Sequence, residues 1–265
     1  MNKKKLIPII ALSIGVILIA IAIIFQSPVG RGPVVSQDFA VDRFTGINIG
    51  GNHEIIWTES NEFAVRIEMQ ENLLRHMQVT VQNDTLRIRS TRNNINIFGI
   101  GSGSNTRTRI YIYSPSLSSV NFSGSIRVEN WDDIYTDNFS LNASGAATIN
   151  LVVNAETLDI DTSGSARVTV AANVETLYVD SSGAGTFNLS GTTSTLDIAA
   201  SGSARVNAND LQAATANINI SGAGNANVNV TDYLNVRISG SGRVTYSGTP
   251  RVTQNISGAG RVTSQ

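Results

Sequence analysis

The sequence predicts an all-β protein, a parallel β-helix (solenoid) preceded by one N-terminal transmembrane helix. Eight Ser-Gly pairs recur at intervals of about 18 to 21 residues in the second half of the chain, and the residue after each pair alternates between Ser and Ala. A fixed period of this kind indicates stacked coils, one for each repeat. Aliphatic residues two positions apart also recur on both sides of the pairs. The glycines expected at the corners of the stack are Gly124, Gly145, Gly164, Gly183, Gly202, Gly222, Gly240 and Gly258.

Each repeat is predicted to hold two short strands and two turns. Leu177 and Val179 precede one Ser-Gly pair, whereas Val168 and Val170 follow the pair before it, and a polar or solvent-compatible residue separates the members of each couple. A spacing of two directs both side chains to one face of a strand, so these aliphatic residues are the predicted core. Glycine suits the corner because it tolerates a positive φ and has no Cβ to collide with the coils above and below.

The coil length is open to two interpretations. A coil of about 19 residues holds one Ser-Gly pair, and a coil of about 38 residues holds two. The fourth position after each serine alternates between Arg and a neutral residue, as in Arg127, Thr148, Arg167, Thr186 and Arg205. The longer coil would place arginines in adjacent strands, where like charges repel, whereas the shorter coil separates them. The pattern therefore favours the coil of about 19 residues.

Residues 1–26 are expected to form a membrane anchor. Leu6 to Phe25 is a run of 20 apolar or small residues, long enough to cross a bilayer as a helix. The lysines at positions 3 to 5 place its N-terminal side in the cytoplasm. The sequence from Ala20 to Ala22 resembles a signal-peptide cleavage site, so a cleaved signal is the alternative. With either interpretation, the bulk of the chain lies outside the cytoplasm, at a cell membrane.

The exported part divides into three expected segments. Residues 27–37 contain two prolines and two glycines and are expected to be a linker. Residues 38–115 alternate like strands without the Ser-Gly period, and residues 116–265 carry the repeats. Within the first of these β segments, Glu71 to Met77 reads as a short helix, and Asn94 to Thr106 reads as a loop rich in Gly and Asn.

Four motifs in order resemble the head GIN domain family. They are Phe44 to Ile49 (FTGINI), Glu71 to Leu74 (ENLL), Asp84 to Ile88 (DTLRI) and the Ser-Gly coils. The family is labelled as the head of autotransporter adhesins and was formerly a domain of unknown function. The resemblance covers about Asp38 to Gly260 and implies a parallel β-helix in a bacterial envelope protein. It supplies no catalytic residues to carry over.

Neither catalytic residues nor cofactors are expected. The chain has no Cys, and its only histidines, His53 and His76, are expected on the surface of a strand or helix. Asp159 and Asp197 are predicted in one column two coils apart, hence ~10 Å from each other. This loosely approaches the carboxyl separation of ~6.5–9.5 Å in inverting glycosidases. A polysaccharide-cleaving enzyme is therefore a minor alternative.

Asp161 and Asp180 form the one weak candidate for a metal site. They are one coil apart at matching positions, so the shorter coil places them ~5 Å from each other. Two close carboxylates either share a proton or bind a cation such as Ca²⁺, although their side chains can also splay into water. Beyond residue 30, 16 arginines face 20 acidic residues and form no basic cluster, so nucleic acid is not an expected partner.

These observations predict a membrane-anchored, extracytoplasmic β-helix that acts as a non-catalytic, adhesin-like binding surface. Its expected partners are an envelope glycan or a surface protein, since a ladder of amides and hydroxyls suits extended ligands. Aromatic residues such as Tyr178 can stack on sugars, but at 6% of the chain they predict no wide aromatic platform. The alternative is an envelope structural or signalling module that forms a homo-oligomer through the open strand edge of its C-terminal coil.

Overall fold

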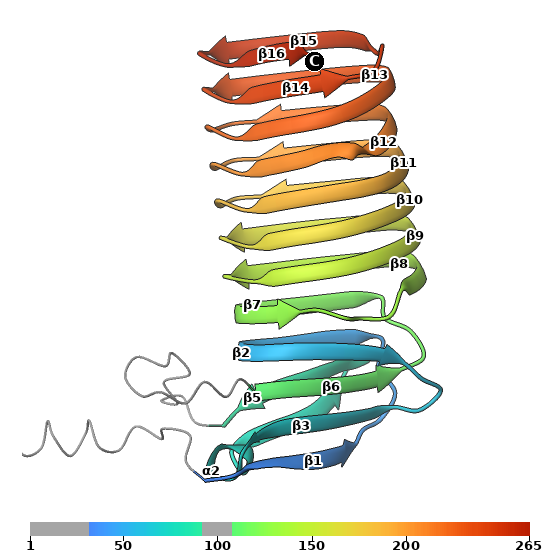
Figure 1. Cartoon of the computed structure of the whole chain (residues 1–265), viewed down its shortest axis with the longest axis vertical. Coiled ribbons are helices and arrows are strands. Elements are labelled where there is room, and N and C mark those ends of the chain that lie inside the picture. Colours follow the sequence, from blue (N-terminus) through green and yellow to red (C-terminus); the bar gives the residue numbers. More distant parts are fainter. Residues whose placement is uncertain (1–31, 92–107) are drawn as a thin grey trace, which may run out of the picture.

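The computed structural model describes residues 32–91 and 108–265, and these residues form a parallel β-solenoid (Figure 1). Sixteen strands belong to one continuous sheet. Nowhere in these two ranges is there a helix long and apolar enough to cross a membrane. The expected anchor, Leu6 to Phe25, and the expected loop, Asn94 to Thr106, lie outside the described residues, so both stay predictions.

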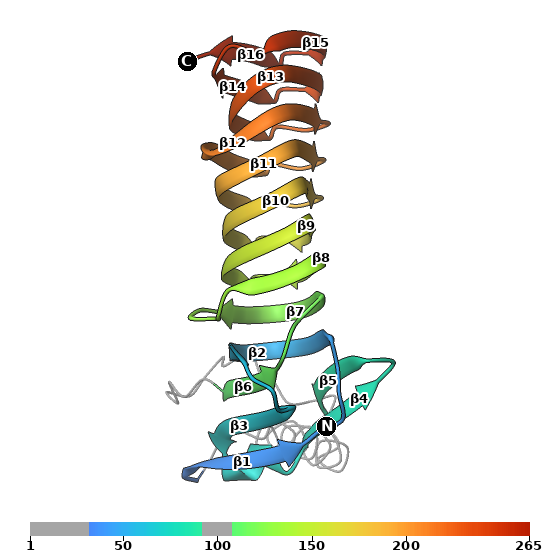
Figure 2. The same cartoon turned by 90° about the vertical axis from the view of Figure 1, so that its right-hand side faces the viewer.

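Long strands build most of the stack. Each runs along one side of a coil, around a bend and back along the other side, so that its two halves lie on opposite sides of the core (Figures 1 and 2). The Ser-Gly corner then leads into the next coil. The strands of the repeat region are β7 (Ser119–Val128), β8 (Ile134–Gly145), β9 (Thr148–Gly164), β10 (Arg167–Ser181), β11 (Thr186–Ala200), β12 (Arg205–Ile220), β13 (Asn225–Gly240), β14 (Arg243–Ser247), β15 (Arg251–Gly258) and β16 (Arg261–Ser264).

The register between neighbouring coils confirms the short coil. Strands β10 and β11 are parallel, with Val168 opposite Phe187 and Tyr178 opposite Asp197, so each residue meets its counterpart from the very next Ser-Gly repeat. The alternative coil with two Ser-Gly pairs is therefore wrong. A bulge in β12 lengthens one coil, because its pairing with β11 shifts from Asn188 opposite Asn207 to Ser190 opposite Asp210.

Alternating burial along the strands confirms the predicted core. In β10, residues with buried side chains alternate with exposed ones on both sides of the bend. Leu158, Leu177 and Leu196 stack in register from coil to coil, and all three are fully buried. Each coil thus packs its aliphatic residues against those of its neighbours, which makes the core one continuous column along the solenoid.

The segment before the repeats extends the same sheet. Strand β2 (Gly46–Glu59) pairs in parallel with β7, from Gly46 opposite Ser119 to Ile55 opposite Val128, and so forms one more rung. Strands β6 (Thr108–Ser114) and β3 (Ala64–Gln70) continue beyond β2, the latter antiparallel to β6. The expected division at residues 115 and 116 is therefore not a break in the sheet.

The first strand lies partly in the expected linker. Strand β1 runs from Val34 to Ala40, whereas the linker was expected to continue to residue 37. The expectation fails because β1 pairs antiparallel with β3, and Val35 and Phe39 pack against the core. Hydrogen bonds to β3 and apolar packing outweigh the turn-forming prolines and glycines that precede the strand.

The short helix is also smaller than expected. Only α2 (Glu71–Leu74) is helical, and Met77 already begins β4 (Met77–Gln82). Strand β4 forms an antiparallel hairpin with β5 (Thr85–Ser90), whose first residues also pair with β2. The extended pairing of Met77 with Ser90 explains why the helix ends after one turn.

The corner glycines lie in register in one column. A Cβ at Gly145 would lie 2.5 Å from the carbonyl oxygen of Gly124, and a similar collision recurs at the other corners. The coils are this close because the carbonyl oxygen of one corner glycine accepts a backbone hydrogen bond from the next coil, as Gly164 does from Ala184 at 2.8 Å. A positive φ is not required at every corner glycine. Gly164 has a φ of 136°, whereas Gly183 is needed only for the space that it leaves.

Strands β15 and β16 form the last described coil, and each pairs on one side only. Val252 and Val262 continue two core columns but are partly exposed. Gln254 takes the place that Val236 fills one coil earlier. A polar residue in a core column is typical of a terminal repeat, which must face water. Within the described residues this end remains an open strand edge.

Candidate binding surfaces

The strand halves before the Ser-Gly corners present an outward surface, which we call the Tyr178 face. Its side chains point away from the core because they alternate with buried aliphatic residues. Two outward columns cross five coils in register. The first column holds Asp159, Tyr178, Asp197, Asn217 and Asn235, and the second holds Asp161, Asp180, Ala199, Asn219 and Arg237.

Tyr178 lies within an open hollow of about 520 Å³ on this face. Its side chain is 44% exposed, and its register neighbours are Asp159 on one side and Asp197 on the other. The amide of Asn217 donates a 2.6 Å hydrogen bond to the Asp197 carboxylate, which holds that side chain along the column. An exposed aromatic ring with acceptors on either side offers both stacking and hydrogen bonds to one ligand.

Asp159 has an altered acidity on this face. Partial burial raises its pKa, and the negative charges of Asp161 and Asp180 raise it further. Asp159 therefore takes up a proton at a higher pH than an isolated aspartate does.

The predicted acid pairs differ in how the coils arrange them. Asp161 and Asp180 are direct register neighbours in β9 and β10, as the short coil requires. No cluster of three His, Cys, Asp or Glu side chains suited to a metal ion occurs in residues 32–91 and 108–265, so the cation site stays a prediction. Asp159 and Asp197 are two rungs apart, and Tyr178 occupies the rung between them.

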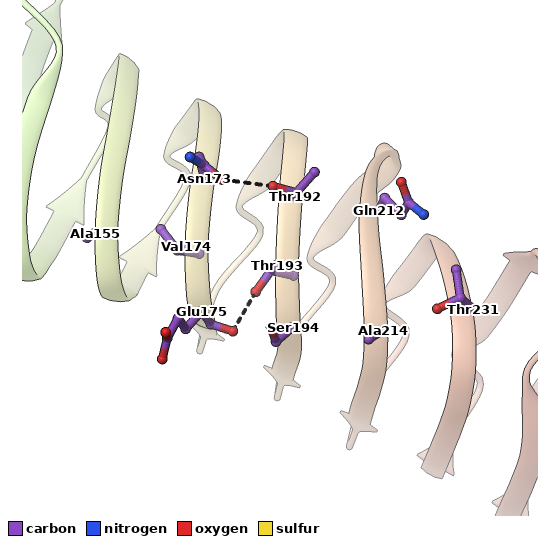
Figure 3. Close-up of a pocket in the computed structure, with 10 residues that line it drawn as sticks. All are labelled: Ala155, Asn173, Val174, Glu175, Thr192, Thr193, Ser194, Gln212, Ala214 and Thr231. Atoms are coloured by element: carbon purple, nitrogen blue, oxygen red, sulfur yellow. Dashed lines mark hydrogen bonds between the residues drawn. The ribbon is translucent and has the colours of Figure 1, made fainter.

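A second hollow, of about 490 Å³, lies at the bend that joins the two strand halves (Figure 3). The hydroxyl groups in this hollow already form hydrogen bonds within the protein. Thr192 donates to the Asn173 side chain at 2.9 Å, and the buried Thr193 hydroxyl lies within 3.1 Å of the backbone carbonyls of Glu175 and Thr195. These bonds satisfy polar groups where the strand curves, so this hollow is a weaker candidate for a ligand than the Tyr178 face.

His53 is buried, contrary to the expectation of a surface histidine. Its side chain is 4% exposed, its Nε2 lies 3.2 Å from the carbonyl oxygen of Gly50, and its buried Nδ1 has no hydrogen-bond partner. Burial lowers the pKa of His53 to about 4, although the contact with Gly50 opposes the shift. The ring is therefore neutral near pH 7 and belongs to the core of the first coil.

The first coil contains a corner that the Ser-Gly period misses. Gly51 lies in register with Gly124 and has a φ of 126°. The sequence does contain a signal for this corner. Residues 47–55 (INIGGNHEI) show the same alternation of apolar and polar residues as residues 120–128 (VNFSGSIRV), with Gly50 in place of Ser123. The alignment would have placed His53 opposite Ile126, inside the core.

The fold and its surfaces define a class of protein: a parallel β-solenoid with a glycine corner in each coil and polar outward columns. The chain belongs to the family described as "Putative auto-transporter adhesin, head GIN domain", which it matches over residues 43–180 and 152–250. No curated protein matches the sequence.

Solved structures share this architecture. A structure called a "putative adhesin" from Parabacteroides merdae ATCC 43184 is 23% identical, has a TM-score of 0.79, and covers 89% of this chain and 98% of its own. Another "putative adhesin", from Parabacteroides distasonis ATCC 8503, has the same identity and coverage and a TM-score of 0.78. A "putative lipid binding protein" from the same strain also has this identity and coverage, with a TM-score of 0.77. At this identity the likeness establishes the fold alone.

Proposed function

We propose that this chain is a membrane-anchored, extracytoplasmic binding module that is adhesin-like and non-catalytic, and that its Tyr178 face binds a glycan. The single observation that carries the proposal is the exposed Tyr178 ring, with Asp159 and Asp197 as its register neighbours. The ring stacks on the apolar face of a sugar, and the flanking carboxylates accept hydrogen bonds from its hydroxyls. Amides continue the column at Asn217 and Asn235, so further sugars find donors and acceptors along the solenoid.

The same arrangement argues against glycan cleavage. Hydrolysis by two carboxyl groups needs both to flank one glycosidic bond, with room for water or for direct attack. In this chain Tyr178 takes the rung between Asp159 and Asp197. A ring in that place suits retention of a sugar rather than attack on its linkage.

Anchoring rests on the apolar run from Leu6 to Phe25 and the lysines before it. Strand β1 lies at one end of the strand order and β16 at the other. An anchor shortly before β1 holds that end at a bacterial cell membrane, with the N-terminus in the cytoplasm. The Tyr178 face is then several coils away from the bilayer, accessible to an envelope glycan or a surface protein that carries one.

Replacement of the ring tests this proposal. The Tyr178→Ala variant of the full-length chain, purified in detergent, is expected to bind its glycan at least about tenfold more weakly, because tyrosines at the centre of a contact contribute strongly. Affinity is measured on an array of neutral and envelope oligosaccharides, followed by calorimetry with the best ligand. Tyr135→Ala is the matched control, since Tyr135 is 63% exposed but does not line this hollow.

Two results would contradict the proposal. One is an array on which the unaltered chain binds no glycan. The other is an equal loss of affinity in the Tyr178→Ala and Tyr135→Ala variants, because it would place the ligand away from the Tyr178 face.

Self-association is the second candidate function, and the open edge of β15 and β16 favours it. Ile256 is 37% exposed there. Residues 233–265, however, contain four arginines and no acidic residue, so two such ends repel each other at low salt. A dimer in sedimentation equilibrium that strengthens with salt would distinguish this function from glycan binding.

A further inference from the structure

We propose that the face opposite Tyr178 is a second binding site, for a linear acidic polysaccharide that carries one carboxylate on every second sugar. This site, which we call the arginine column, lies on the strand halves that follow the Ser-Gly corners. It is independent of the Tyr178 face in position, in charge and in the ligand that it recognises.

The arginine column is one outward position followed from β7 to β16; in β2 the same position holds Glu54. Each member pairs with the next across the parallel sheet, and basic residues alternate with neutral ones until the last step, where two arginines are adjacent. The column runs Arg127, Thr148, Arg167, Thr186, Arg205, Asn225, Arg243 and Arg261.

Beyond Arg127, the arginines of this column lack acidic partners. Of the five arginines in this column, all within the described residues, only Arg127 makes an ion pair, with Glu129 at 2.9 Å, whereas Arg167, Arg205, Arg243 and Arg261 are exposed and make none. From Thr148 onward the strand halves after the corners contain one acidic residue before the bend, Asp210, which lies opposite Ser190 and outside the arginine column. The acidic side chains gather instead on the Tyr178 face, so the two sides of the solenoid differ in charge.

The last step of the column also indicates a ligand. Arg243 and Arg261 are direct register neighbours, and like charges opposite each other in adjacent strands are destabilising. Solubility alone would be served by arginines placed apart, as in the rest of the column. An anion shared by the two guanidinium groups would remove the repulsion.

The spacing selects the kind of anion. Neighbouring rungs are ~4.8 Å apart, so arginines on alternate rungs are ~10 Å apart. An extended glycan advances by about one rung per sugar ring, so a carboxylate on every second sugar meets an arginine each time. The planar guanidinium group forms paired hydrogen bonds with a carboxylate.

A ladder of amides beside the arginine column supplies contacts for the sugar hydroxyls. Asn207 donates to the Asn188 side chain at 3.0 Å, and Asn227 donates to Asn207 at 3.4 Å. Each donating amide has a second N–H, which is not used in the ladder. The ladder holds these groups at one per rung, in step with the sugar rings.

The test compares two double variants that remove equal charge. Hyaluronan oligosaccharides, which alternate an acidic and a neutral sugar, are titrated against the full-length chain in detergent by calorimetry at low and high salt. The unaltered chain is expected to bind and to weaken as salt rises. Arg205→Gln with Arg243→Gln is expected to weaken binding at least about tenfold. The control double variant, Arg43→Gln with Arg251→Gln, changes two arginines outside the column and is expected to leave hyaluronan binding unchanged.

Several outcomes would overturn the proposal. The proposal fails if the unaltered chain does not bind hyaluronan at low salt. It also fails if both double variants lose the same affinity, because the arginine column would then not be the binding site. Tighter binding of polygalacturonate, with a carboxylate on every sugar, would refute the spacing, and a preference for polyphosphate would refute the carboxylate. The Tyr178→Ala variant keeps hyaluronan binding on this proposal, so the failure of either site is recognisable separately.

Discussion

Gly183→Val is expected to lower the free energy of unfolding by more than about 3 kcal/mol. A Cβ at this corner would collide with the carbonyl oxygen of Gly164 and lie 2.6 Å from its nitrogen. The carbonyl oxygen cannot move away without loss of its 2.8 Å hydrogen bond from the backbone of Ala184. The valine therefore either separates two coils or breaks the corner ladder. Urea denaturation followed by circular dichroism measures the change.

Ala184→Val is the control for this corner. Ala184 is the next residue along the chain and is exposed, so its substitution should change stability by less than about 0.5 kcal/mol. Equal stability of the Gly183→Val variant and the unaltered chain would show that the corner does not need the close stacking of glycines.

Acidification from pH 7 to pH 5 is expected to cost about 2 kcal/mol of stability through His53 alone. Burial lowers the pKa of His53 to about 4 in the folded chain, from an ordinary value of 6.5. The unfolded chain therefore takes up a proton that the folded chain refuses between these values. Stability is full above pH 6.5 and is lost as the pH falls toward 4. Urea denaturation at pH 7 and pH 5 measures the difference.

The His53→Ile variant isolates this contribution. Ile126 occupies the same core column in the next coil, so isoleucine suits the position, and it does not titrate. Carboxylates and His76 are common to both proteins and cancel in the comparison. The variant should lose about 2 kcal/mol less than the unaltered chain over this pH range. The same pH dependence in both would contradict the buried, neutral His53.

The repeat region was predictable because every coil repeats the same pattern of residues. Val168 and Leu177 alternate with polar neighbours, and the Ser-Gly pair marks where each coil ends. Each coil contacts only its nearest neighbours in the stack. The interval between repeats in the sequence therefore determines which residues of adjacent coils lie opposite each other. The charge argument from Arg167 and Thr186 then separated the two coil lengths correctly.

The first coil was less predictable because its corner lacks the serine. Gly50 and Gly51 take the place of the Ser-Gly pair, and β1 pairs antiparallel with β3, a strand that follows only after the whole of β2. Such long-range pairing leaves no fixed interval in the sequence. The burial of His53 follows only when β2 is aligned on β7.

The candidate surfaces were predictable only in part. The register of Asp159, Tyr178 and Asp197 follows from the coil length, and Tyr178 was identified as able to stack on a sugar. The open hollow around that ring depends on how side chains from five coils are arranged, which the period does not determine. The bulge of β12, between Asn207 and Asp210, lengthens the interval from Ser201 to Ser221 to 20 residues, but that interval alone does not place the extra residue within the coil.

Disulfide formation between introduced cysteines tests the stacking of coils that hold one Ser-Gly pair each, on which both proposed binding sites depend. The chain has no cysteine of its own, so an introduced pair is free of competing thiols. Thr176 and Thr195 are register neighbours, at the ~4.8 Å between adjacent strands and within the Cα separation of ~4.4–6.8 Å that a disulfide needs. Thr215 lies one rung further, at ~10 Å from Thr176. Under mild oxidation, the Thr176→Cys/Thr195→Cys variant should form the disulfide and the Thr176→Cys/Thr215→Cys variant should not, whereas the reverse result would contradict the stack.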